Sequence, residues 1–328
     1  MHNYTKTFGI DIGKKTFDVV DSSGSYYQFD NNPKGFAAFL QLLDRDSHCV
    51  MEATGYYHYR LAYFLNENHI PVSVENPLSI KRFIQMKLMR VKTDKSDARM
   101  ICHYGQEREL SLWRGYSEHQ TECLQMLGLL DTYTKQCTAL KNKIKAEAVL
   151  GNPSELVVRS LNRSLRTLQL EITEIEEALM QLVELEYRDI VRSLRSIPGI
   201  GPKTATMLVV VTDGFKRFER GAQLCSFCGL TPVIRQSGSS VKGKARISKV
   251  GNAKLRNLLF LCSFTASKNN KACKELYDRL IARGKSKKLA LIAVSNKLLK
   301  QAFAISKSGI EYTESYQNNL AFSHSWQK

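Results

Sequence analysis

The sequence predicts an α/β chain, in which a mixed β-sheet domain is followed by long helices and a mainly helical C-terminal domain. Three observations predict this class. Short apolar segments separated by turn residues fill the N-terminal part, as expected of strands that alternate with helices. Apolar residues then recur in a heptad spacing, which is typical of long paired helices. A tight glycine turn between two helical segments opens the last third.

The N-terminal elements follow a defined order. Three short strands come first, with turns between them, and helices and strands then alternate. The order β-β-β-α-β-α-β-α is that of the RNase H-like fold. We expect strands over residues 7–12, 16–21, 25–29, 48–53 and 70–74, and helices from Pro33, over 57–68, over 81–89 and from an N-cap at Thr93 or Asp94.

A single carboxylate interrupts the first strand. Asp11 lies within the apolar run from Phe8 to Ile12, where an isolated charge is costly to bury unless hydrogen bonds or a cation compensate it. Gly9 and Gly13 leave the neighbouring backbone open to a bulky group such as a phosphate. From this segment alone, a structural aspartate and a metal or phosphate site are equally good interpretations.

Three more acids are expected near Asp11. Glu52 ends the next core strand, and Asp94 and Asp97 lie three residues apart at a helix start, so they share a face of that helix. In an RNase H-like sheet, the ends of the first and fourth strands and a late helix converge. Four carboxylates there would repel one another unless divalent cations neutralised them, and ligands of this kind suit Mg²⁺ or Mn²⁺.

Two such ions can bind the attacking and the leaving oxygen of a phosphodiester. Taken alone, Asp94 and Asp97 are better explained as acids that the helix dipole favours. Taken with Asp11 and Glu52, they are better explained as metal ligands. The sequence therefore predicts a Mg²⁺ or Mn²⁺ site formed by these four residues.

Two long helices are predicted after Trp113. Their apolar residues alternate spacings of three and four, and Gly151-Asn152-Pro153 separates them. The helices can form an antiparallel hairpin, pair with another subunit, or both, and packing against their own domain is equally compatible. We interpret them as a spacer and oligomerisation element. The heptad positions are Met126, Leu130, Tyr133, Cys137, Leu140 and Ile144 in the first helix and Val158, Leu161, Leu165, Leu168, Ile172, Ile175, Leu179 and Leu182 in the second.

The positive charge is concentrated at one end of the chain. The net charge is +17 at pH 7. Residues 1–107 hold 13 Lys and Arg against 12 Asp and Glu, residues 108–191 hold 10 against 13, and residues 192–308 hold 24 against 4. A domain this basic indicates a surface that binds a polyanion, although a merely soluble basic face is the simpler alternative.

The basic region opens with a helix-hairpin-helix pattern. A helix ends near Ile197, the Gly199-Ile200-Gly201 segment turns tightly, and Pro202 begins the next helix at its first position. Backbone N–H groups of such a hairpin can hold a DNA phosphate, which positions a duplex without reading its sequence. A purely structural hairpin is the alternative. The residues expected to contact nucleic acid are Gly199, Gly201, Lys203 and Thr204.

Residues 229–252 mix glycines and hydroxyl groups with cations. Glycine lets the backbone approach a ligand closely, so composition alone favours a solvated phosphate-binding loop. A serine among these cations and near a metal would also be suited to attack phosphorus, because both stabilise the charged transition state. The expected nucleic-acid-binding cations are Arg235, Lys242, Lys244, Arg246 and Lys249.

The cysteines and the apolar segments exclude other classes. Eight cysteines are scattered along the chain, and Cys225 and Cys228 form the only close pair, which is better explained as two core thiols than as a metal site. The setting indicated is a reducing cytoplasm. No apolar run approaches the ~18 residues of a membrane span, and the N-terminus has no secretory pattern.

The combined motifs resemble those of the IS110-type insertion-sequence transposases, the DEDD transposase and Piv-invertase family, which includes bridge-RNA-guided recombinases. The resemblance covers nearly the whole chain, and the motifs are specific in combination and in this order. The segments GIDIGK, MEATG and KTDKSDA match that family's RuvC-like domain, and IPGIGPKTA, GLTP, RQSGSS, GKARISKVGN and LR match its transposase domain.

The resemblance implies a division into four parts. These are a RuvC-like DEDD metal-binding domain (residues 1–110), a helical coiled-coil spacer (111–191), a basic transposase domain with the helix-hairpin-helix and serine motifs (192–308) and a tail (309–328).

The resemblance also implies a DNA transposase or recombinase. Ser237 would be the nucleophile that links covalently to DNA, with Ser239 and Ser240 as close alternatives, while a Mg²⁺ or Mn²⁺ site assists. The DEDD metal ligands would be Asp11, Glu52, Asp94 and Asp97.

Family members act on double-stranded donor and target DNA, and a structured guide RNA selects both by base pairing. They work as homodimers or homotetramers, in which one subunit's RuvC-like domain and another's serine domain build a composite site. The implied location is the bacterial cytoplasm and nucleoid. The sequence shows no zinc finger and no clear recognition helix, as suits guided recognition.

Three other readings of the residues differ in testable ways. A metal-dependent nuclease such as a junction resolvase would share the acids and the basic surface but would form no covalent intermediate and would not need Ser237. An actin-like ATPase or sugar kinase also opens with GIDIG, but needs a second Asp-Gly phosphate loop, which the sequence lacks. A nucleic-acid-binding scaffold without activity would have no reason to keep all four acids.

Overall fold

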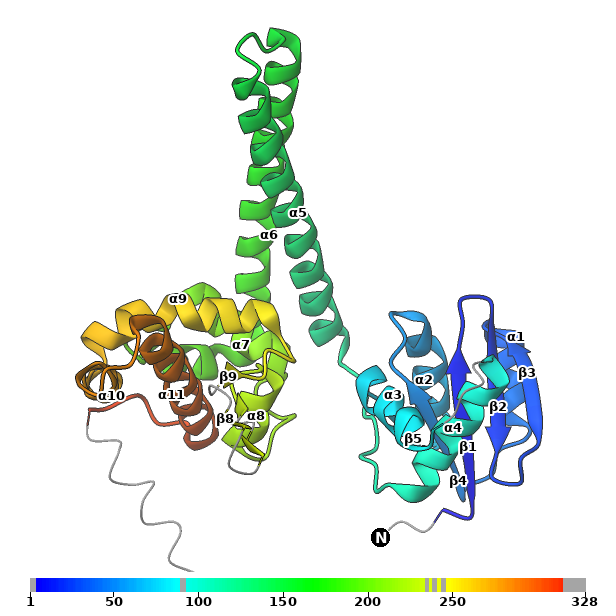
Figure 1. The fold of residues 1–328 in the computed structure, drawn as a ribbon. Coiled ribbons are helices and arrows are strands. Elements are labelled where there is room, and N and C mark those ends of the chain that lie inside the picture. Colours follow the sequence, from blue (N-terminus) through cyan, green and yellow to red (C-terminus); the bar gives the residue numbers. More distant parts are fainter. Residues whose placement is uncertain (1–3, 89–92, 234–235, 238–240, 243–245, 315–328) are drawn as a thin grey trace, which may run out of the picture. The chain divides into compact units, whose positions relative to one another are not determined.

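The chain folds into two compact units, Met1–Tyr116 and Ser117–Lys328 (Figure 1). The structure is a computed structural model and describes residues 4–88, 93–233, 236–237, 241–242 and 246–314. The first unit combines a sheet with helices, and the second is mainly helical, so the predicted mixed class is confirmed. The long helices belong to the same unit as the C-terminal helices. The finer division at residues 110, 191 and 308 stays a prediction.

One mixed sheet organises the first unit, with the strand order β3-β2-β1-β4-β5. Tight turns join the antiparallel pairs β1–β2 and β2–β3. A helix then leads from β3 to β4, which pairs in parallel with β1, and another helix joins the parallel strands β4 and β5. All five predicted strands are present. They are β1 (Lys6–Ile12), β2 (Thr16–Asp21), β3 (Tyr26–Asp30), β4 (Ser47–Glu52) and β5 (Val72–Glu75).

Helices cover both faces of this sheet. Phe8, Ile10 and Ile12 of β1 pack into a core with α1 and α2 on one face. On the other face α4 lies along β1 and β2, and α3 packs against α4 (Figure 1). These helices are α1 (Pro33–Leu40), α2 (Tyr57–Glu67), α3 (Pro77–Met86) and α4 (Asp94–Glu107).

Helix α3 begins four residues before the expected start at Lys81. The side chain of Asn76 caps it by accepting a hydrogen bond from the backbone N–H of Leu78. Pro77 occupies the first helical position, where its missing N–H costs nothing. The Asn-Pro pair is therefore the start signal that the apolar spacing alone did not reveal.

The expectation that Gly9 leaves room for a phosphate was wrong. A Cβ atom at Gly9 would lie 2.1 Å from the backbone nitrogen of Cys102 and 2.3 Å from the carbonyl oxygen of Ala98. Both atoms belong to α4. The bulky group that needs a glycine here is thus the protein's own helix, which packs directly on the strand backbone.

In the second unit, two long helices form an antiparallel hairpin, α5 (Glu118–Val149) and α6 (Glu155–Arg195) (Figure 1). The predicted heptad residues of both helices are all half-buried or buried, whereas most positions between them are exposed. The seam is therefore the contact between α5 and α6. Near its base, Cys123 and Leu179 join the hairpin to the main core of the unit. Tyr187 has non-helical dihedral angles (φ −124°, ψ 22°) and kinks α6.

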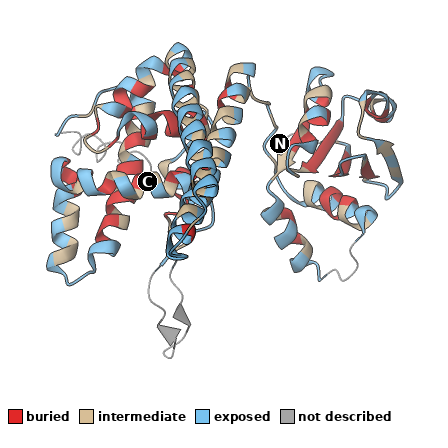
Figure 2. Cartoon of the chain, turned by 90° about the horizontal axis from the view of Figure 1, so that it is seen from above, coloured by how far each residue is buried: buried red, intermediate tan, exposed pale blue. Residues whose placement is uncertain are grey.

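The rest of the second unit packs around that core. Figure 2 shows the buried residues concentrated in these helices and mostly exposed residues along the hairpin. Two short ladders, β6 with β9 and β7 with β8, connect α8 to α9. The elements are α7 (Pro202–Thr212), α8 (Gly221–Phe227), β6 (Pro232–Val233), β7 (Gln236–Ser237), β8 (Val241–Lys242), β9 (Arg246–Ile247), α9 (Ala253–Asn269), α10 (Lys271–Ala282) and α11 (Lys287–Ser308).

Helix α11 is long and apolar enough to cross a membrane, judged by length and composition over the described residues. The search for an uninterrupted apolar run missed this helix, because lysines interrupt its apolar residues. In the fold, α11 is a core helix, and Val294, Leu298 and Ile305 on it are fully buried. Core helices of soluble proteins pass the same test, so the finding is weak evidence for a membrane.

The Cys225 and Cys228 thiols are both buried in the core of the second unit. Burial raises the pKa of both, that of Cys228 to about 12, so they stay protonated at neutral pH. Protonated core thiols make poor metal ligands, and the interpretation as packing residues fits the structure.

Candidate functional site

Four carboxylates lie in one row across the sheet of the first unit. Asp11 of β1 is directly opposite Asp18 of β2, and Glu52 of β4 is directly opposite Glu75 of β5. The register of β1 and β4 runs to the pair Ile10–Met51, which brings Asp11 level with Glu52. We call Asp18, Asp11, Glu52 and Glu75 the carboxylate row.

The carboxylate row faces helix α4. Gly9 touches α4, and Asp11, two residues further along the strand, points to the same side. A Cβ atom at Gly105 of α4 would collide with the side chain of Val50, so Val50 and Glu52 face α4 as well. Residues directly opposite each other share a face of the sheet, so Asp18 and Glu75 also face α4.

The first turn of α4 brings two further acids to the neighbourhood of Asp11. Thr93 accepts a hydrogen bond from the backbone N–H of Ser96, and the Ser96 hydroxyl accepts one from the backbone N–H of Thr93. This capping box fixes the start of the helix, so Asp94 and Asp97 both lie in its first turn. The positive end of the helix dipole favours both charges there.

Burial and neighbouring acids raise the pKa of Asp11 from 3.8 to about 6. Desolvation is the largest cause, followed by the charges of Asp97, Asp94, Glu52 and Asp18 in that order. The structure thus brings the four predicted acids into one neighbourhood. Across the part of the chain that is described, no three His, Cys, Asp or Glu side chains already form a set that could hold a metal ion. A divalent cation would relieve the repulsion that the Asp11 carboxyl experiences.

Sequence reasoning missed Asp18 and Glu75. Asp18 is only 4% exposed and accepts hydrogen bonds from the Tyr26 hydroxyl and the Gln28 side-chain amide. Burial raises the pKa of Glu75, to which the Tyr104 hydroxyl of α4 donates a hydrogen bond (3.5 Å). Asp18 lies within the predicted strand over residues 16–21, which also holds Asp21, and Glu75 directly follows the predicted strand over residues 70–74. An acid within or beside a strand is the kind of signal that singled out Asp11.

The glycines of the predicted helix-hairpin-helix differ in their surroundings. Gly199 has φ +110°, and a Cβ atom there would lie 2.7 Å from the Cβ of Ala266 in α9. Packing therefore requires a glycine at this position. Gly201 caps α7, and no atom lies within 4 Å of where its Cβ would be. Of the two, Gly201 is the one with open space beside it.

The next two predicted contact residues already have partners within the protein. The Lys203 ammonium lies 2.6 Å from the Glu176 carboxylate of α6, although the lysine side chain is 66% exposed. Thr204 is 4% exposed, and its hydroxyl lies 3.2 Å from the sulfur of Cys262. The Thr204 side chain therefore faces the core.

The predicted nucleophile lies in a short hairpin. The backbone of Ser237, in β7, is paired with that of Val241, and Gln236 is paired with Lys242. Arg246 of β9 and Lys249 are both exposed. The remaining predicted residues Arg235, Ser239, Ser240 and Lys244 lie outside the described residues.

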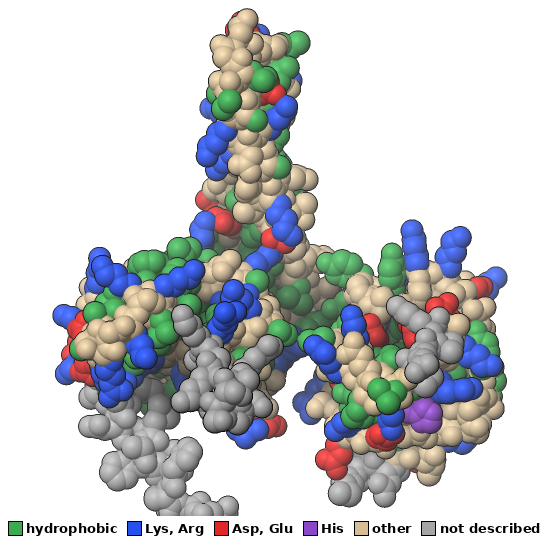
Figure 3. Space-filling model, in the orientation of Figure 1, with side chains coloured by type: hydrophobic (Ala, Val, Ile, Leu, Met, Phe, Trp, Pro, Cys, Tyr) green, Lys and Arg blue, Asp and Glu red, His purple; other side chains and the backbone are tan. Residues whose placement is uncertain are grey.

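Basic side chains are dense on the C-terminal helices of the second unit. Figure 3 shows Lys and Arg side chains spread over the region of α9, α10 and α11 on the visible face. Residues 192–308 carry 24 Lys and Arg against 4 Asp and Glu, so this surface attracts polyanions.

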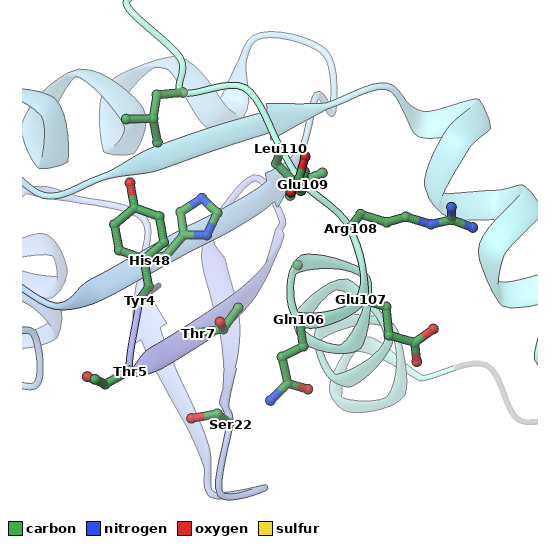
Figure 4. Close-up of a pocket in the computed structure, with 12 residues that line it drawn as sticks. Tyr4, Thr5, Thr7, Ser22, His48, Gln106, Glu107, Arg108, Glu109 and Leu110 are labelled. Carbon is green, nitrogen blue, oxygen red and sulfur yellow. The ribbon is translucent and has the colours of Figure 1, made fainter. Parts of the chain in front are cut away.

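A cavity of about 550 Å³ lies at the other end of the sheet from the carboxylate row, with Tyr4, Thr7 and His48 in its wall (Figure 4). Burial lowers the pKa of His48 to about 4, so its ring is neutral at pH 7. The Ser73 hydroxyl donates to the carbonyl oxygen of Ser111 (3.0 Å), so the Nε2–H of His48 donates to Ser73 (2.8 Å). His48 is bonded as a core histidine.

Comparison with known proteins gives consistent matches along the chain. A transposase family model of the DEDD, IS110 type matches residues 8–150, and the model described as "Transposase IS116/IS110/IS902 family" matches residues 191–278. Pilin gene-inverting proteins of Moraxella lacunata and Moraxella bovis are each 31% identical to the chain, over 92% of its length and 96% of theirs. The transposase for insertion sequence element IS1111A of Coxiella burnetii is 24% identical, over 89% of this chain and 87% of its own.

The first family model covers the carboxylate row, and the second covers α7 to α9 and part of α10. The similarity to the Moraxella proteins extends over both units. The chain therefore belongs to the IS110 family of transposases and DNA-inverting proteins, and it is a DNA transposase or recombinase.

Proposed function

We propose that the protein cuts and rejoins DNA through a serine nucleophile in the second unit, assisted by divalent metal at the acids of the first. The observation that carries this proposal is the environment of Asp11, whose pKa is raised by burial and by Asp97, Asp94 and Glu52. Such crowding of acids is a feature of functional sites more often than of structural ones. The strand order, with three antiparallel strands and two parallel additions, supports an RNase H-like fold for this unit.

The donor set fits Mg²⁺ or Mn²⁺. Every candidate ligand is a carboxylate, and hard divalent cations prefer oxygen ligands. Asp11, Glu52, Asp94 and Asp97 would hold the metal, and Asp18, which accepts hydrogen bonds from Tyr26 and Gln28, would add its negative charge beside Asp11. When bound, the metal would supply charge neutralisation to the phosphodiester.

Ser237 supplies the covalent step in this proposal. Its Oγ attacks a DNA phosphorus, the O–H proton leaves to solvent or a nearby base, and the bond from phosphorus to the departing DNA oxygen breaks. Attack of another DNA hydroxyl on the phosphoserine reverses the step and releases the serine. No phosphodiester is lost overall, so strands are exchanged without hydrolysis.

The substrates are double-stranded DNA segments, held by the basic surface of the second unit. Because two relatives are named pilin gene-inverting proteins, inversion as well as transposition is a reaction to test. We further propose a structured guide RNA as the source of sequence selection, a homodimer or homotetramer as the working form, and the bacterial cytoplasm and nucleoid as the location.

The test is a search for protein–DNA adducts that resist denaturant. The full-length protein is incubated with DNA and RNA from its own flanking sequence and with Mg²⁺ or Mn²⁺, beside Ser237→Ala and Asp11→Ala variants. Loss of the adduct in both variants is the expected result. Ser267→Ala, on α9 and outside the serine hairpin, serves as the matched serine control and should keep the adduct.

The outcomes separate the alternatives. An adduct that survives Ser237→Ala moves the nucleophile to Ser239 or Ser240. Cleavage without any adduct, unaffected by all three serine substitutions, would establish a metal-dependent nuclease of the junction-resolvase type instead.

A further inference from the structure

A cavity in the second unit combines an apolar floor with a basic rim. Its volume is about 810 Å³, and its walls come from α11, α10 and the β6–β9 ladder. Leu230, Ile247 and Ile292 contribute buried or half-buried apolar side chains to the floor. Sites for small ligands have volumes of roughly 300–1,000 Å³, so a group of nucleotide size fits here.

The side chains at the rim of this cavity include five cations and no carboxylate. None of the five cations forms an ion pair with a carboxylate of the described residues. Elsewhere in the same unit, exposed lysines do so, as Lys203 does with Glu176 and Lys254 with Asp131. Unpaired cations around one hollow favour an anionic ligand. They are Arg246, Lys249, Lys288, Lys297 and Lys300.

One stripe of side chains on helix α11 contributes to both the apolar floor and the basic rim of the cavity. Leu289, Ile292, Asn296 and Lys300 follow one another at spacings of three and four, so they share a face that changes from apolar to basic. The Asn296 side-chain amide donates a hydrogen bond to the carbonyl oxygen of Leu230 on the facing wall (3.3 Å). This bond ties the two walls together, so the cavity is formed before any ligand arrives.

Lys249 holds an unfavourable backbone conformation at the rim. Its φ of +58° lies in the left-handed region, which glycine adopts at much lower cost. Its backbone N–H donates to the carbonyl oxygen of Gly229, which fixes the turn. Strained residues cluster at functional sites, so the Lys249 side chain is a candidate for ligand contact.

We propose that this cavity binds a single unpaired nucleotide of the DNA substrate, with the phosphate on the rim cations and the base on the apolar floor. In a duplex the base faces are hidden in the stack, so only an unpaired nucleotide presents a charge and a flat apolar face together. The proposal deepens the proposed function and rests on it, because the serine hairpin β7–β8 lies in the sequence between the two strands of the β6–β9 ladder.

The test compares two single strands with the same number of phosphates. One is an oligothymidylate, and the other is an abasic strand of equal length, so the ratio of their dissociation constants isolates the contribution of the bases. Fluorescence anisotropy is measured with the full-length Ser237→Ala protein in EDTA. No chemistry occurs under these conditions, so failure of the serine mechanism would appear only in the adduct assay.

The wild-type cavity should bind the base-bearing strand at least tenfold more tightly than the abasic strand. Making the apolar part of the α11 stripe polar, by Leu289→Gln with Ile292→Gln, should lower the ratio to less than threefold and leave the abasic affinity unchanged. Leu261→Gln, on α9 and 63% exposed, is the matched control and should keep the full ratio. The thermal unfolding midpoint of each variant checks that it folds.

Lys249→Gly tests the rim cations independently of the apolar floor. This substitution should not impair folding, because glycine relieves the backbone strain. It should weaken both strands by a similar factor, while Lys145→Ala on α5 should weaken neither. Equal affinity for base-bearing and abasic strands in the parent protein, or a ratio that survives the double glutamine substitution, would overturn the proposal. A base preference seen with RNA and not with DNA would also overturn it.

Discussion

The carboxyl group of Asp11 loses solvation against the sheet and lies among other carboxylates, and both effects raise its pKa from 3.8 to about 6. The folded protein therefore binds a proton here more tightly than the unfolded chain does. This contribution to stability is fully present below pH 4 and is lost as the pH rises through about 6. Without a bound cation, the charged form of Asp11 opposes folding at neutral pH.

Replacing Asp11 by asparagine should therefore stabilise the metal-free protein. In EDTA at pH 7.5 we expect Asp11→Asn to raise the free energy of unfolding by about 1–2 kcal/mol, a figure reduced for solvent screening of a partly exposed group. The gain should shrink at pH 5, where the wild-type carboxyl is mostly protonated. Urea unfolding at the two pH values measures it. Asp30→Asn, at the exposed end of β3, should show no such pH dependence, and an equal gain at both pH values for Asp11→Asn would contradict the argument.

A bound divalent cation should offset the destabilisation that the charged Asp11 carboxylate causes at neutral pH. At pH 7.5, Mg²⁺ or Mn²⁺ should raise the Tm of the wild-type protein by several degrees, because ligand binding to the folded state stabilises it. The shift should be largely lost in Glu52→Gln and Asp97→Asn. Glu67→Gln, an exposed acid on α2, should keep it. Differential scanning fluorimetry with and without metal makes the comparison, and a full shift in all three variants would remove these acids from the site.

Helix α4 presents two acids because a capping box fixes its first turn. Thr93→Ala should cost about 1 kcal/mol of stability, as loss of an N-cap does, and should also weaken the Tm response to Mg²⁺. Ser117 caps α5 in the other unit with the same kind of hydrogen bond. Ser117→Ala should therefore cost similar stability and leave the Mg²⁺ response intact. Equal Mg²⁺ responses in the two variants would show that the capping box does not position the acids.

The α5–α6 hairpin uses its heptad seam internally, so contact with another subunit needs a different surface. Leu156, Leu170 and Leu185 of α6 lie off the seam and are 74%, 66% and 80% exposed. We expect Leu170→Glu with Leu185→Glu to lower the oligomeric mass of the full-length protein in sedimentation velocity. Gln169→Glu, an exposed neighbour, should leave the mass unchanged. An unaltered mass in the leucine variant would place the subunit contact elsewhere.

Local patterns predicted the elements, and long-range pairing decided the details of the site. The strands and the Thr93 cap follow from the spacing of residues near in sequence. The register that sets Asp18 opposite Asp11 and Glu75 opposite Glu52 depends on pairing between separate strands, which no local pattern specifies. The same holds for Gly9, whose role became clear only with α4 packed on it.

The molecule as a whole separates its charges along the chain. Residues 1–107 are nearly balanced in charge, whereas residues 192–308 carry a large excess of Lys and Arg. The acids of the proposed metal site thus lie in a part with little net attraction for DNA, and in the proposed function the basic part supplies the affinity. Cations that contact phosphates release counterions from DNA, so affinity should fall steeply with salt.

Removing cations from the two units should therefore have different consequences. Each phosphate contact contributes about 0.9 to the slope of log affinity against log salt. Lys271→Gln with Lys274→Gln, both exposed on α10, should lower the magnitude of that slope by about 2 and weaken binding to all duplex sequences alike. Lys34→Gln with Arg45→Gln, an exposed pair in the first unit, removes the same charge and should leave the slope unchanged. The slope comes from anisotropy titrations of the full-length protein over a range of salt concentrations. If the slope of log affinity against log salt falls equally in the two double variants, DNA contacts both units alike. The uneven charge distribution would then serve solubility and not a separate DNA-binding role of the second unit.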